Sequence, residues 1–455
     1  QRAYWMGQSL GLPLSCGTRY LVELDGDNVD IQRLENAWNT LVDRHEMLRV
    51  EIDGQGQQRI LKKVPRCKIT EQETHAGTTE VAQRLLKHWW QKLSVNDKNT
   101  LFAIKVITYG KNKRVRLGLM FNYMTLDGFS IKLLLQELAT LYQNIDAQLP
   151  CFDLSFRDYV TQVQYDPNTL NLAEQYWYEK LNSLPLAAQL PLAIDPIKIE
   201  HVRFSRREAK ISQSSWASLR KLAKHQGITP SVMILVVYGE VLSRWNGGQA
   251  HTLNLTLFDR QNVHPDINKI AGDFTSLAPV AYYPDSTKSF IEIAKTIQGE
   301  IADVLEHREV SSIWVQRERA KQIGMTAAAL PIVFTSTLGM SDALLEDLPM
   351  SDFPQIVGGG LSETPQVWLD HQMYEHQGEL FISWDSIDEL FPKDLLKEMF
   401  ESFTSLLNSL ANSENFQTCW GSAIACELPD KQKSKRAEAN KTEKQIAPSV
   451  LHQGL

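Results

Sequence analysis

The chain has 455 residues and a formal net charge of −7 at pH 7, with 43% hydrophobic and 22% charged residues. This composition is typical of a folded globular protein, and the length is more than one compact core usually spans. The negative charge argues against a nucleic-acid partner, and no apolar run reaches the roughly 18 residues that would predict a membrane helix. The five cysteines fit neither a zinc site nor a disulfide framework, which is typical of thiols in a reducing cytoplasm. We therefore expect a cytoplasmic protein of two or three lobes, with neither nucleic acid nor a membrane as its partner.

The first part of the chain predicts a helix, a strand and a second helix. Residues 31–42 place apolar side chains at helical spacing, and "RHEMLRVEI" after them is typical of a turn followed by a strand. Residues 115–121 alternate apolar with polar or small side chains, which predicts a strand with one buried face. Ser130 then begins a helix with a Leu-rich face. The stretch "FNYMTLDGFS", residues 121–130, is therefore a strand-to-helix loop, where open sheets commonly expose reactive groups.

Farther along the chain, composition indicates the domain boundaries. Residues 182–196 carry three prolines and are typical of a crossing between two lobes, after which helices are expected near 214–225 and over 229–245. Beyond about residue 427 the chain is polar, charged and poor in large apolar residues, as inter-domain linkers are. We assign residues 1–181 to a first lobe, 182–426 to a second lobe and 427–455 to a linker. No spacing predicts a metal site or a bound cofactor.

Seven segments in chain order resemble those of a single family. They are "QRAYWMGQ" (1–8), "RHEMLRVEIDGQGQQ" (44–58), "LPLAAQLPLAIDP" (184–196), "TPSVMILVVYGEVLSRW" (229–245), "AGDFTSL" (271–277), "LPIVFTSTLG" (330–339) and "SETPQVWLDHQ" (362–372) with "SWD" (383–385). The chain resembles a heterocyclization domain of a nonribosomal peptide synthetase, a specialised relative of the condensation domain. The resemblance implies a mixed α/β fold in which two chloramphenicol-acetyltransferase-like lobes form a V-shaped pseudodimer with a central tunnel.

The loop at 121–130 agrees with that family at two of three positions. Ordinary condensation domains carry HHxxxDG here, and their two histidines fall on Asn122 and Tyr123. Heterocyclization domains carry DxxxxDxxS instead, which falls on Asn122, Asp127 and Ser130, so the asparagine is the departure. The resemblance implies catalytic roles for Asn122 and Asp127. An Asp-Gly pair before a helix is also good turn and cap chemistry, and Arg260 is the expected cationic partner of Asp127. Ser130 is a better helix cap than nucleophile.

The second lobe carries the pair that the resemblance implies for ring formation. Asp370 in "TPQVWLD" matches the family's cyclodehydration aspartate, and Thr335 in "VFTS" matches its partner threonine. Asp370 needs apolar surroundings to be a useful acid at neutral pH. Gln366, Ser130 and Tyr123 are expected to position the substrate. From the residues alone, a strand-end hydroxyl at Thr335 and a turn cap at Asp370 remain the simpler interpretation.

By resemblance, the function is condensation of a carrier-bound acyl donor with carrier-bound Cys, Ser or Thr, followed by cyclodehydration to a thiazoline or oxazoline. Siderophore biosynthesis is a common setting for such chemistry. No cofactor is expected to bind, because donor and acceptor carrier proteins supply the 4′-phosphopantetheine arms. "IAPSVLHQGL" resembles the lead-in to an adenylation domain. Two alternatives stay open: one member of a tandem pair that performs only one half-reaction, and a catalytically silent carrier-docking domain. A free-standing acyltransferase is disfavoured, because position 123 is Tyr.

Overall fold

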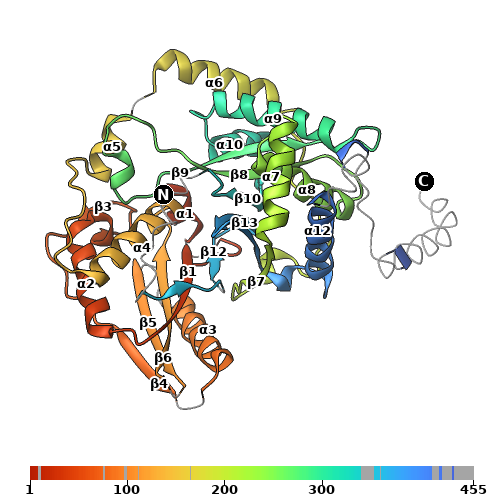
Figure 1. Ribbon diagram of the computed structural model, residues 1–455. Coiled ribbons are helices and arrows are strands. Elements are labelled where there is room, and N and C mark those ends of the chain that lie inside the picture. Colours follow the sequence, from red (N-terminus) through yellow and green to blue (C-terminus); the bar gives the residue numbers. More distant parts are fainter. Residues whose placement is uncertain are drawn as a thin grey trace.

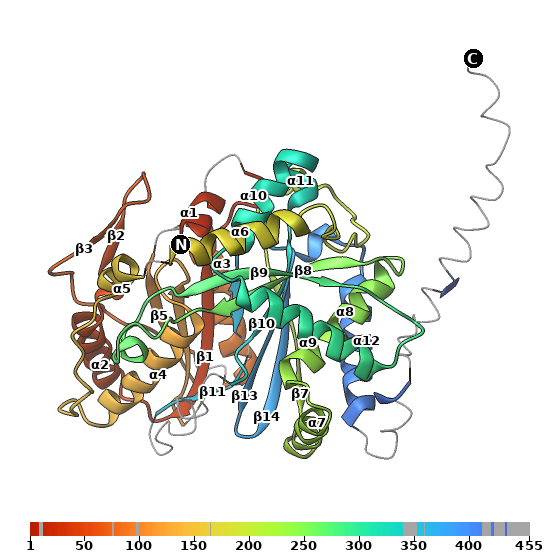
Figure 2. The same ribbon diagram turned by 90° about the horizontal axis from the view of Figure 1, so that it is seen from above.

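The computed structural model describes residues 1–8, 12–74, 77–96, 100–110, 112–163, 165–339, 353–358, 360–411, 420–422 and 433–434. Within these ranges the chain forms two lobes, each built around its own sheet and its own hydrophobic core. Figures 1 and 2 show the helices α2 (Ile31–Arg44) and α4 (Gly128–Gln143) on one side of the molecule and α7 (Gln213–His225), α8 (Pro230–Trp245) and α12 (Leu395–Ala411) on the other. Apart from Lys433 and Ser434, the predicted linker from about residue 427 lies outside the described residues.

The first sheet has the strand order β11-β1-β6-β5-β4, and β12 also pairs with β1. Its strands are β1 (Arg19–Asp27), β4 (Thr70–Thr74), β5 (Phe102–Tyr109), β6 (Arg114–Asn122), β11 (Gln355–Ile356) and β12 (Leu361–Glu363). The first part of the chain also contains a small hairpin and several helices. They are β2 (Val50–Ile52), β3 (Gln58–Ile60), α1 (Arg2–Gly7), α2 (Ile31–Arg44), the 3₁₀ helix η1 (Glu46–Leu48), α3 (Thr79–Asn96), α4 (Gly128–Gln143), α5 (Phe156–Gln162) and α6 (Pro167–Lys180).

Helices cover both faces of the first sheet. The alternating apolar residues of β6 pack with α2 and α4 in the main core of this lobe, as their spacing predicts. On the opposite face, Gly118 lies under Leu86 and Trp89 of α3, and a Cβ at position 118 would approach the Trp89 ring to 3.2 Å. Arg116, also on that face, forms a buried ion pair with Glu23. The prediction of a single buried face for β6 was therefore wrong, because α3 covers the other face.

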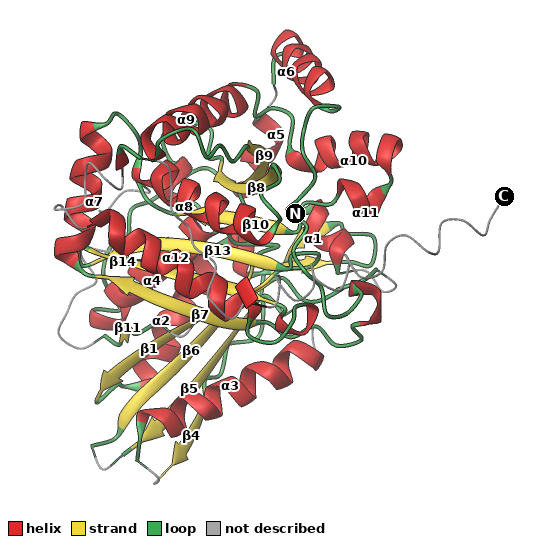
Figure 3. Cartoon of the chain, turned by 90° about the vertical axis from the view of Figure 1, so that its right-hand side faces the viewer, coloured by secondary structure: helices red, strands yellow, loops and turns green. Residues whose placement is uncertain are grey.

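The second sheet has the strand order β7-β14-β13-β10-β8-β9. Its strands are β7 (Ser205–Ile211), β8 (His251–Phe258), β9 (Thr275–Tyr282), β10 (Ile332–Ser336), β13 (Leu369–His376) and β14 (Glu379–Ser386). Its helices are η2 (Pro196–Lys198), α7 (Gln213–His225), α8 (Pro230–Trp245), η3 (Ile267–Lys269), α9 (Phe290–Glu306), α10 (Ser312–Ile323), α11 (Met325–Ala328), η5 (Asp388–Leu390) and α12 (Leu395–Ala411). Figure 3 shows the two sheets as separate sets of strands with helices around them.

The two lobes exchange structural elements. Strands β11 and β12 follow β10 in the chain, yet they pair with β1 of the first sheet, with Leu24 opposite Ile356 and Tyr20 opposite Ser362. Ile267, Ile270, Ala271 and Phe274 likewise belong to the core of the first lobe. The proline-rich segment 182–196 runs beside β8, where Ala187 forms a bridge with Thr252. Main-chain hydrogen bonds and apolar packing therefore join the lobes at several points.

No single helix among the described residues is long and apolar enough to cross a membrane. Helices α7 and α8 would satisfy the length and composition test only as a pair, and they are bent by 100° relative to one another.

Candidate active site

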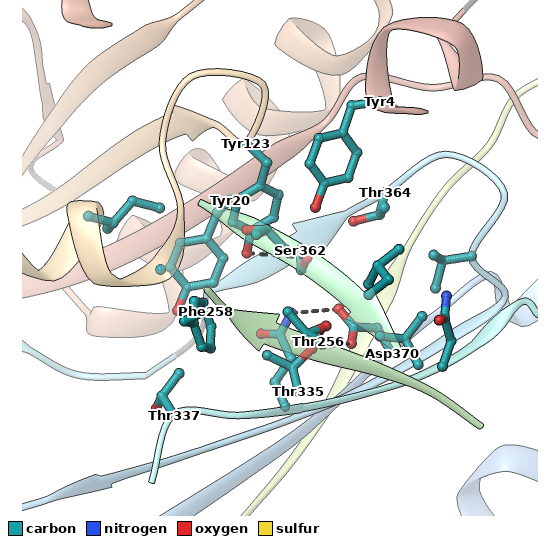
Figure 4. Close-up of a pocket in the computed structure, with 18 of the residues that line it drawn as sticks. Tyr4, Tyr20, Tyr123, Thr256, Phe258, Thr335, Thr337, Ser362, Thr364 and Asp370 are labelled. Carbon is teal, nitrogen blue, oxygen red and sulfur yellow. Dashed lines mark hydrogen bonds between the residues drawn. The ribbon is translucent and has the colours of Figure 1, made fainter. Parts of the chain in front are cut away.

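A cavity of about 310 Å³ lies between the two sheets. On the first-lobe side it is lined by Tyr20 of β1, Tyr123 of the predicted loop and the beginning of α4. On the second-lobe side the lining comes from neighbouring strands: Asn254, Thr256 and Phe258 of β8, Val333 and Thr335 of β10, and Asp370 and Gln372 of β13. Figure 4 shows Tyr4, Tyr20 and Tyr123 on one side of this space and Thr256, Thr335 and Asp370 on the other.

Strand register explains why the second-lobe residues converge. In the parallel pair β10–β13, Val333 is opposite Asp370 and Thr335 is opposite Gln372. On its other side β10 pairs with β8, where Thr335 is opposite Thr256. Since side chains two residues apart in a strand share a face, this register brings two rows of polar side chains to the cavity wall.

Asp370 is the central carboxyl group of this wall. The Thr335 hydroxyl donates to Asp370 Oδ1 over 3.4 Å, and Gln372 Nε2 donates to Asp370 Oδ2 over 2.6 Å. Thr335 Oγ1 also lies 2.8 Å from Thr256 Oγ1. Only 6% of Asp370 is exposed. Burial raises the pKa of Asp370 to about 7, the Asp385 carboxylate adds to the rise, and the hydrogen bonds from Gln372 and Thr335 oppose it. Near neutral pH this group can therefore either accept or donate a proton.

The predicted loop is held by contacts that lie outside the cavity. Asp127 is fully buried and caps α4, with its Oδ1 accepting from the Ser130 N–H at 2.7 Å and from Arg260 Nη2 at 3.0 Å. The pairing with Arg260 that the resemblance predicted is therefore present. Ser130 was expected to begin and cap the helix, but α4 begins at Gly128 and its N-cap is Asp127.

Ser130 instead contributes to the contact between the lobes. Its hydroxyl donates to the Gly272 carbonyl at 2.7 Å and accepts from Arg260 Nη2 at 2.7 Å. The Arg260 guanidinium also lies over the rings of Phe129 and Phe274, at 4.2 and 3.8 Å from their centroids. Asp127, Ser130 and Arg260 thus form a buried junction between lobes, and none of them lines the cavity.

Asn122 also lies away from the cavity. It is fully buried, its Oδ1 accepts from the Thr18 hydroxyl and the Met124 N–H, both at 2.9 Å, and its Nδ2 donates to the Thr100 carbonyl at 3.2 Å. An amide satisfies all of these partners, because the last one requires a donor that a carboxylate lacks. The geometry gives Asn122 a loop-shaping function.

Tyr123 and Gln366 do line the cavity, but with different surroundings. Tyr123 stacks on Tyr20 with the ring centroids 5.8 Å apart and accepts a long hydrogen bond of 3.5 Å from Ser362. Burial raises the pKa of Tyr123 well above its usual value, so its phenol stays neutral. Gln366 is exposed, its backbone has a φ of 66°, and its amide donates to the Pro13 carbonyl. Its side-chain donor group is thus already bonded to the protein.

Sequence reasoning missed several polar residues of the cavity, among them Asn254, Thr256 and Gln372 on the strands beside Thr335 and Asp370. Gln372 holds Asp370, Thr256 contacts Thr335, and Asn254 has a buried Oδ1 with no hydrogen-bond partner among the described residues. Period-two alternation was a usable signal, because Gln372 shares a strand face with Asp370, and Asn254 and Thr256 alternate with buried leucines. Within the described ranges, no group of three or more His, Cys, Asp or Glu side chains is arranged to hold a metal ion.

The family model of the condensation domain matches residues 1–417. The chain belongs to the condensation-domain family. This condensation domain is 31% identical over 409 residues to pyochelin synthetase PchF of Pseudomonas aeruginosa, covering 88% of the chain and 22% of that protein. It is 30% identical over 463 residues to bacitracin synthase 1 of Bacillus licheniformis, which covers 100% of the chain and 9% of that synthase. The chain therefore spans less than a quarter of either relative.

The structure of the condensation domain resembles that of a solved cyclization-docking bidomain. The cyclization-docking bidomain of the nonribosomal peptide synthetase EpoB from Sorangium cellulosum superposes with a TM-score of 0.81 at 31% identity, covering 90% of this chain and 84% of that one. The predicted kinship with heterocyclization domains and the two-lobed, chloramphenicol-acetyltransferase-like α/β fold are confirmed. An enzymatic role in condensation follows from membership of this family.

Proposed function

We propose that this condensation domain joins a carrier-bound acyl donor to carrier-bound Cys, Ser or Thr and then cyclodehydrates the product to a thiazoline or oxazoline. The observation that carries the proposal is Asp370, a carboxyl group at the cavity wall whose pKa is raised to about 7 and which is bonded to Thr335 and Gln372. Similarity to pyochelin synthetase PchF and to the EpoB cyclization bidomain supports it.

Ring closure requires a group that both takes and returns a proton. In the first step the Cys thiol, or the Ser or Thr hydroxyl, forms a bond to the amide carbonyl carbon, and Asp370 accepts the proton of that nucleophile. In the second step Asp370 returns that proton to the former carbonyl oxygen, which becomes a hydroxyl group. The hydroxyl leaves as water with a second proton, which the ring nitrogen releases as the C=N bond forms, so the two protons of the water come from the nucleophile and from the amide N–H. A group with a pKa near the working pH is efficient in both directions.

Amide formation makes a smaller chemical demand. The acceptor amine attacks the donor thioester, and the carrier thiol is the leaving group. Two reactants held in the right orientation can gain on the order of 7–11 kcal/mol from positioning alone. The tyrosine-lined part of the cavity would hold the donor acyl group beside the acceptor, so the loop at 121–130 does not need a histidine for this step.

The proposal includes partners outside the chain. Donor and acceptor carrier proteins would each bring a 4′-phosphopantetheine arm into the cavity, so the domain itself would hold no cofactor. An adenylation domain would follow the condensation domain, and the assembly line would work in the cytoplasm on a siderophore-type product. A tandem member that performs one step would have the same cavity and carry out only condensation or only cyclodehydration. A silent docking domain would have the cavity and carry out neither.

The test is mass spectrometry of the acceptor carrier after incubation with a loaded donor carrier. The proposal predicts that the open amide appears first and is then replaced by a species that has lost one water. Accumulation of amide alone would assign the domain to the condensing member of a tandem pair. Absence of amide would fit either the cyclizing member or a silent docking domain, and these two are distinguished by supplying a preformed open amide on the acceptor carrier, which only the cyclizing member converts. Because Asn122 is buried outside the cavity, we expect its departure from the family pattern to leave amide formation intact.

A further inference from the structure

The side chain that holds Asp370 is itself held in one orientation. Gln372 lies two residues after Asp370 on β13, so both side chains leave the strand on the cavity face. Gln372 Nε2 is 2.6 Å from Asp370 Oδ2, and Gln372 Oε1 accepts from Arg206 Nη2 at 3.4 Å. A guanidinium can only donate hydrogen bonds, so the amide must turn its oxygen toward Arg206 and its N–H toward Asp370.

Arg206 is in turn fixed by a buried carboxylate. Its Nε and Nη2 donate to the two oxygens of Asp385 at 2.7 and 2.5 Å, and Asp385 Oδ2 also accepts from the Ser362 N–H at 2.8 Å. The side chain of Asp385 is fully buried, and only 11% of the Arg206 side chain is exposed. Bidentate pairs of this kind are geometrically specific. The orientation of the Gln372 amide is therefore determined by a chain of contacts that begins in β7, β14 and β12.

This arrangement makes the two oxygens of Asp370 unequal. Oδ2 receives the short hydrogen bond from Gln372, whereas the only hydrogen bond to Oδ1 from the described residues is the long one from the Thr335 hydroxyl. An oxygen that accepts a short hydrogen bond from an N–H is a poor site for an added proton, because protonation turns it into a hydroxyl, which accepts that hydrogen bond more weakly than a carboxylate or carbonyl oxygen does. A proton taken up by Asp370 therefore goes to Oδ1, where Thr335 can turn its own hydrogen toward Thr256 and accept.

We propose that Gln372 is a positioning residue for Asp370, which keeps its N–H on Oδ2 and so leaves Oδ1 as the oxygen that exchanges the substrate proton. This inference rests on the proposed role of Asp370 in ring closure. It also assigns a function to the Arg206–Asp385 pair, which orients the Gln372 amide and through it acts on Asp370.

Gln372 also affects the titration of Asp370, because a donor to the carboxylate favours the charged form. The ionisable groups that interact electrostatically with Asp370 come from five other elements: Arg206 of β7, Asp385 of β14, Tyr238 of α8, Tyr4 of α1 and Tyr123 of the loop after β6. Burial raises the pKa of all three tyrosines well above the usual value, so they stay neutral throughout the neutral pH range. Removing the Gln372 donor should therefore raise the pKa of Asp370 further.

The experiment compares the parent with Gln372→Met, which keeps the length of the side chain and removes its N–H. Ring closure from a preformed open amide on the acceptor carrier is measured from pH 5 to 9, with Asp370→Asn and the exposed Gln175→Met in parallel. The rate should rise with pH as Asp370 loses its proton. In Gln372→Met the midpoint of this pH–rate profile should lie about one to two pH units higher, since losing a hydrogen bond to an ionised group has roughly that effect on its pKa. The Gln175→Met control changes an exposed side chain outside the cavity, so its ring-closure profile should match that of the parent.

A second readout does not need turnover. The difference in melting temperature between the parent and Asp370→Asn, followed against pH, reports the titration of Asp370 in the folded protein. The same difference measured in the Gln372→Met background should move to higher pH. Gln372→Glu serves as the second variant if Gln372→Met does not fold. It retains an acceptor for Arg206 and puts a second carboxyl group beside Asp370, so it should also move the titration of Asp370 to higher pH.

The outcomes separate this inference from the proposed function. An unmoved pH profile in Gln372→Met, together with loss of ring closure in Asp370→Asn, would overturn the positioning role alone. Ring closure at the parental rate in Asp370→Asn would overturn the proposed function and this inference with it. If the parent makes no product, an unmoved titration in the melting experiment still overturns the inference, and an upward shift supports it.

Discussion

Asp127 and Asp370 are both buried carboxylates beside the interface of the two lobes, yet their surroundings differ. Asp127 accepts directly from a guanidinium and a main-chain N–H at a junction that does not line the cavity. Asp370 lines the cavity and is separated from its nearest guanidinium by the Gln372 amide. A buried carboxylate paired directly with a guanidinium joins structural parts, because removing either partner leaves an uncompensated buried charge. A carboxylate shielded from its cation by a neutral amide can exchange a proton. We therefore expect Asp127 to stabilise the junction between the lobes and Asp370 to transfer the proton.

The largest expected effect is on ring closure in Asp370→Asn. The amide keeps the volume of the carboxyl group but cannot take or return the proton, and such groups typically contribute about 10²–10⁴-fold to rate. Open amide should accumulate on the acceptor carrier while the melting temperature stays at or above that of the parent. A time course of both carrier-bound species checks this. Joint loss of amide and ring, with the fold intact, would contradict the division of roles.

Asp127→Ala should mainly lower stability. Removing one member of a buried pair leaves the Arg260 guanidinium without its carboxylate, which typically costs about 3–5 kcal/mol. Denaturant unfolding should show a lower free energy of unfolding. Asp43→Ala is a matched control, because the Asp43–Arg66 pair is exposed to solvent and exposed pairs contribute little. If Asp127→Ala abolishes turnover while the free energy of unfolding is unchanged, Asp127 has a catalytic role and the structural role is wrong.

The pH dependence of stability should reveal the buried carboxyl of Asp370. Its pKa is raised from 3.8 to about 7 on folding, so the folded protein binds this proton more tightly than the unfolded chain does. The resulting stabilisation is complete below about pH 4 and is lost as pH rises to 7. Three units correspond to at most about 4 kcal/mol.

The matching measurement is denaturant unfolding of the parent and Asp370→Asn at several pH values. The variant lacks this titration. The free energy of unfolding of Asp370→Asn minus that of the parent should therefore increase from pH 4 to 7 and stay constant above pH 7. A constant difference across that range would show that Asp370 has an ordinary pKa.

The smallest expected effect belongs to Asn122→Asp. If charge at this position mattered for amide formation, restoring the acidic residue would raise the rate, as the family pattern suggested. The structure predicts no increase, because the side chain is buried away from the cavity and its Nδ2 donates to the Thr100 carbonyl. A carboxylate would face that carbonyl oxygen without a hydrogen, so stability should fall by about 1–3 kcal/mol. Faster amide formation in this variant would contradict the loop-shaping role.

Local patterns predicted the elements whose contacts are close in the chain. Helices α2 and α4 and strand β6 follow from the spacing of their apolar residues, and α8 (Pro230–Trp245) agrees with the helix predicted over 229–245. The pairing of β11 and β12 with β1 had no such signal, because both segments are very short and their partner is more than 300 residues away. Likewise, only the resemblance indicated that Asp127 meets Arg260.

For the cavity, sequence and structure agree on Thr335 and Asp370 and differ on their helpers. Gln366 was expected beside the substrate amide, but its own amide is bonded to Pro13. Gln372, which holds Asp370, was within the same quoted segment and was overlooked, because its role depends on the orientation that Arg206 of another strand imposes. Side-chain direction in this network is a tertiary property, which a linear pattern does not contain.

The most direct test of the central claim is the pH dependence of the ring-closing step itself. Open amide is loaded on the acceptor carrier, and a single turnover to the cyclized species is followed from pH 5 to 9 in the parent and in Asp370→Asn. We expect the parental rate to change around pH 7, where Asp370 titrates, and the slow residual reaction of the variant to lack this change. The same pH profile in both proteins would show that another group moves the proton.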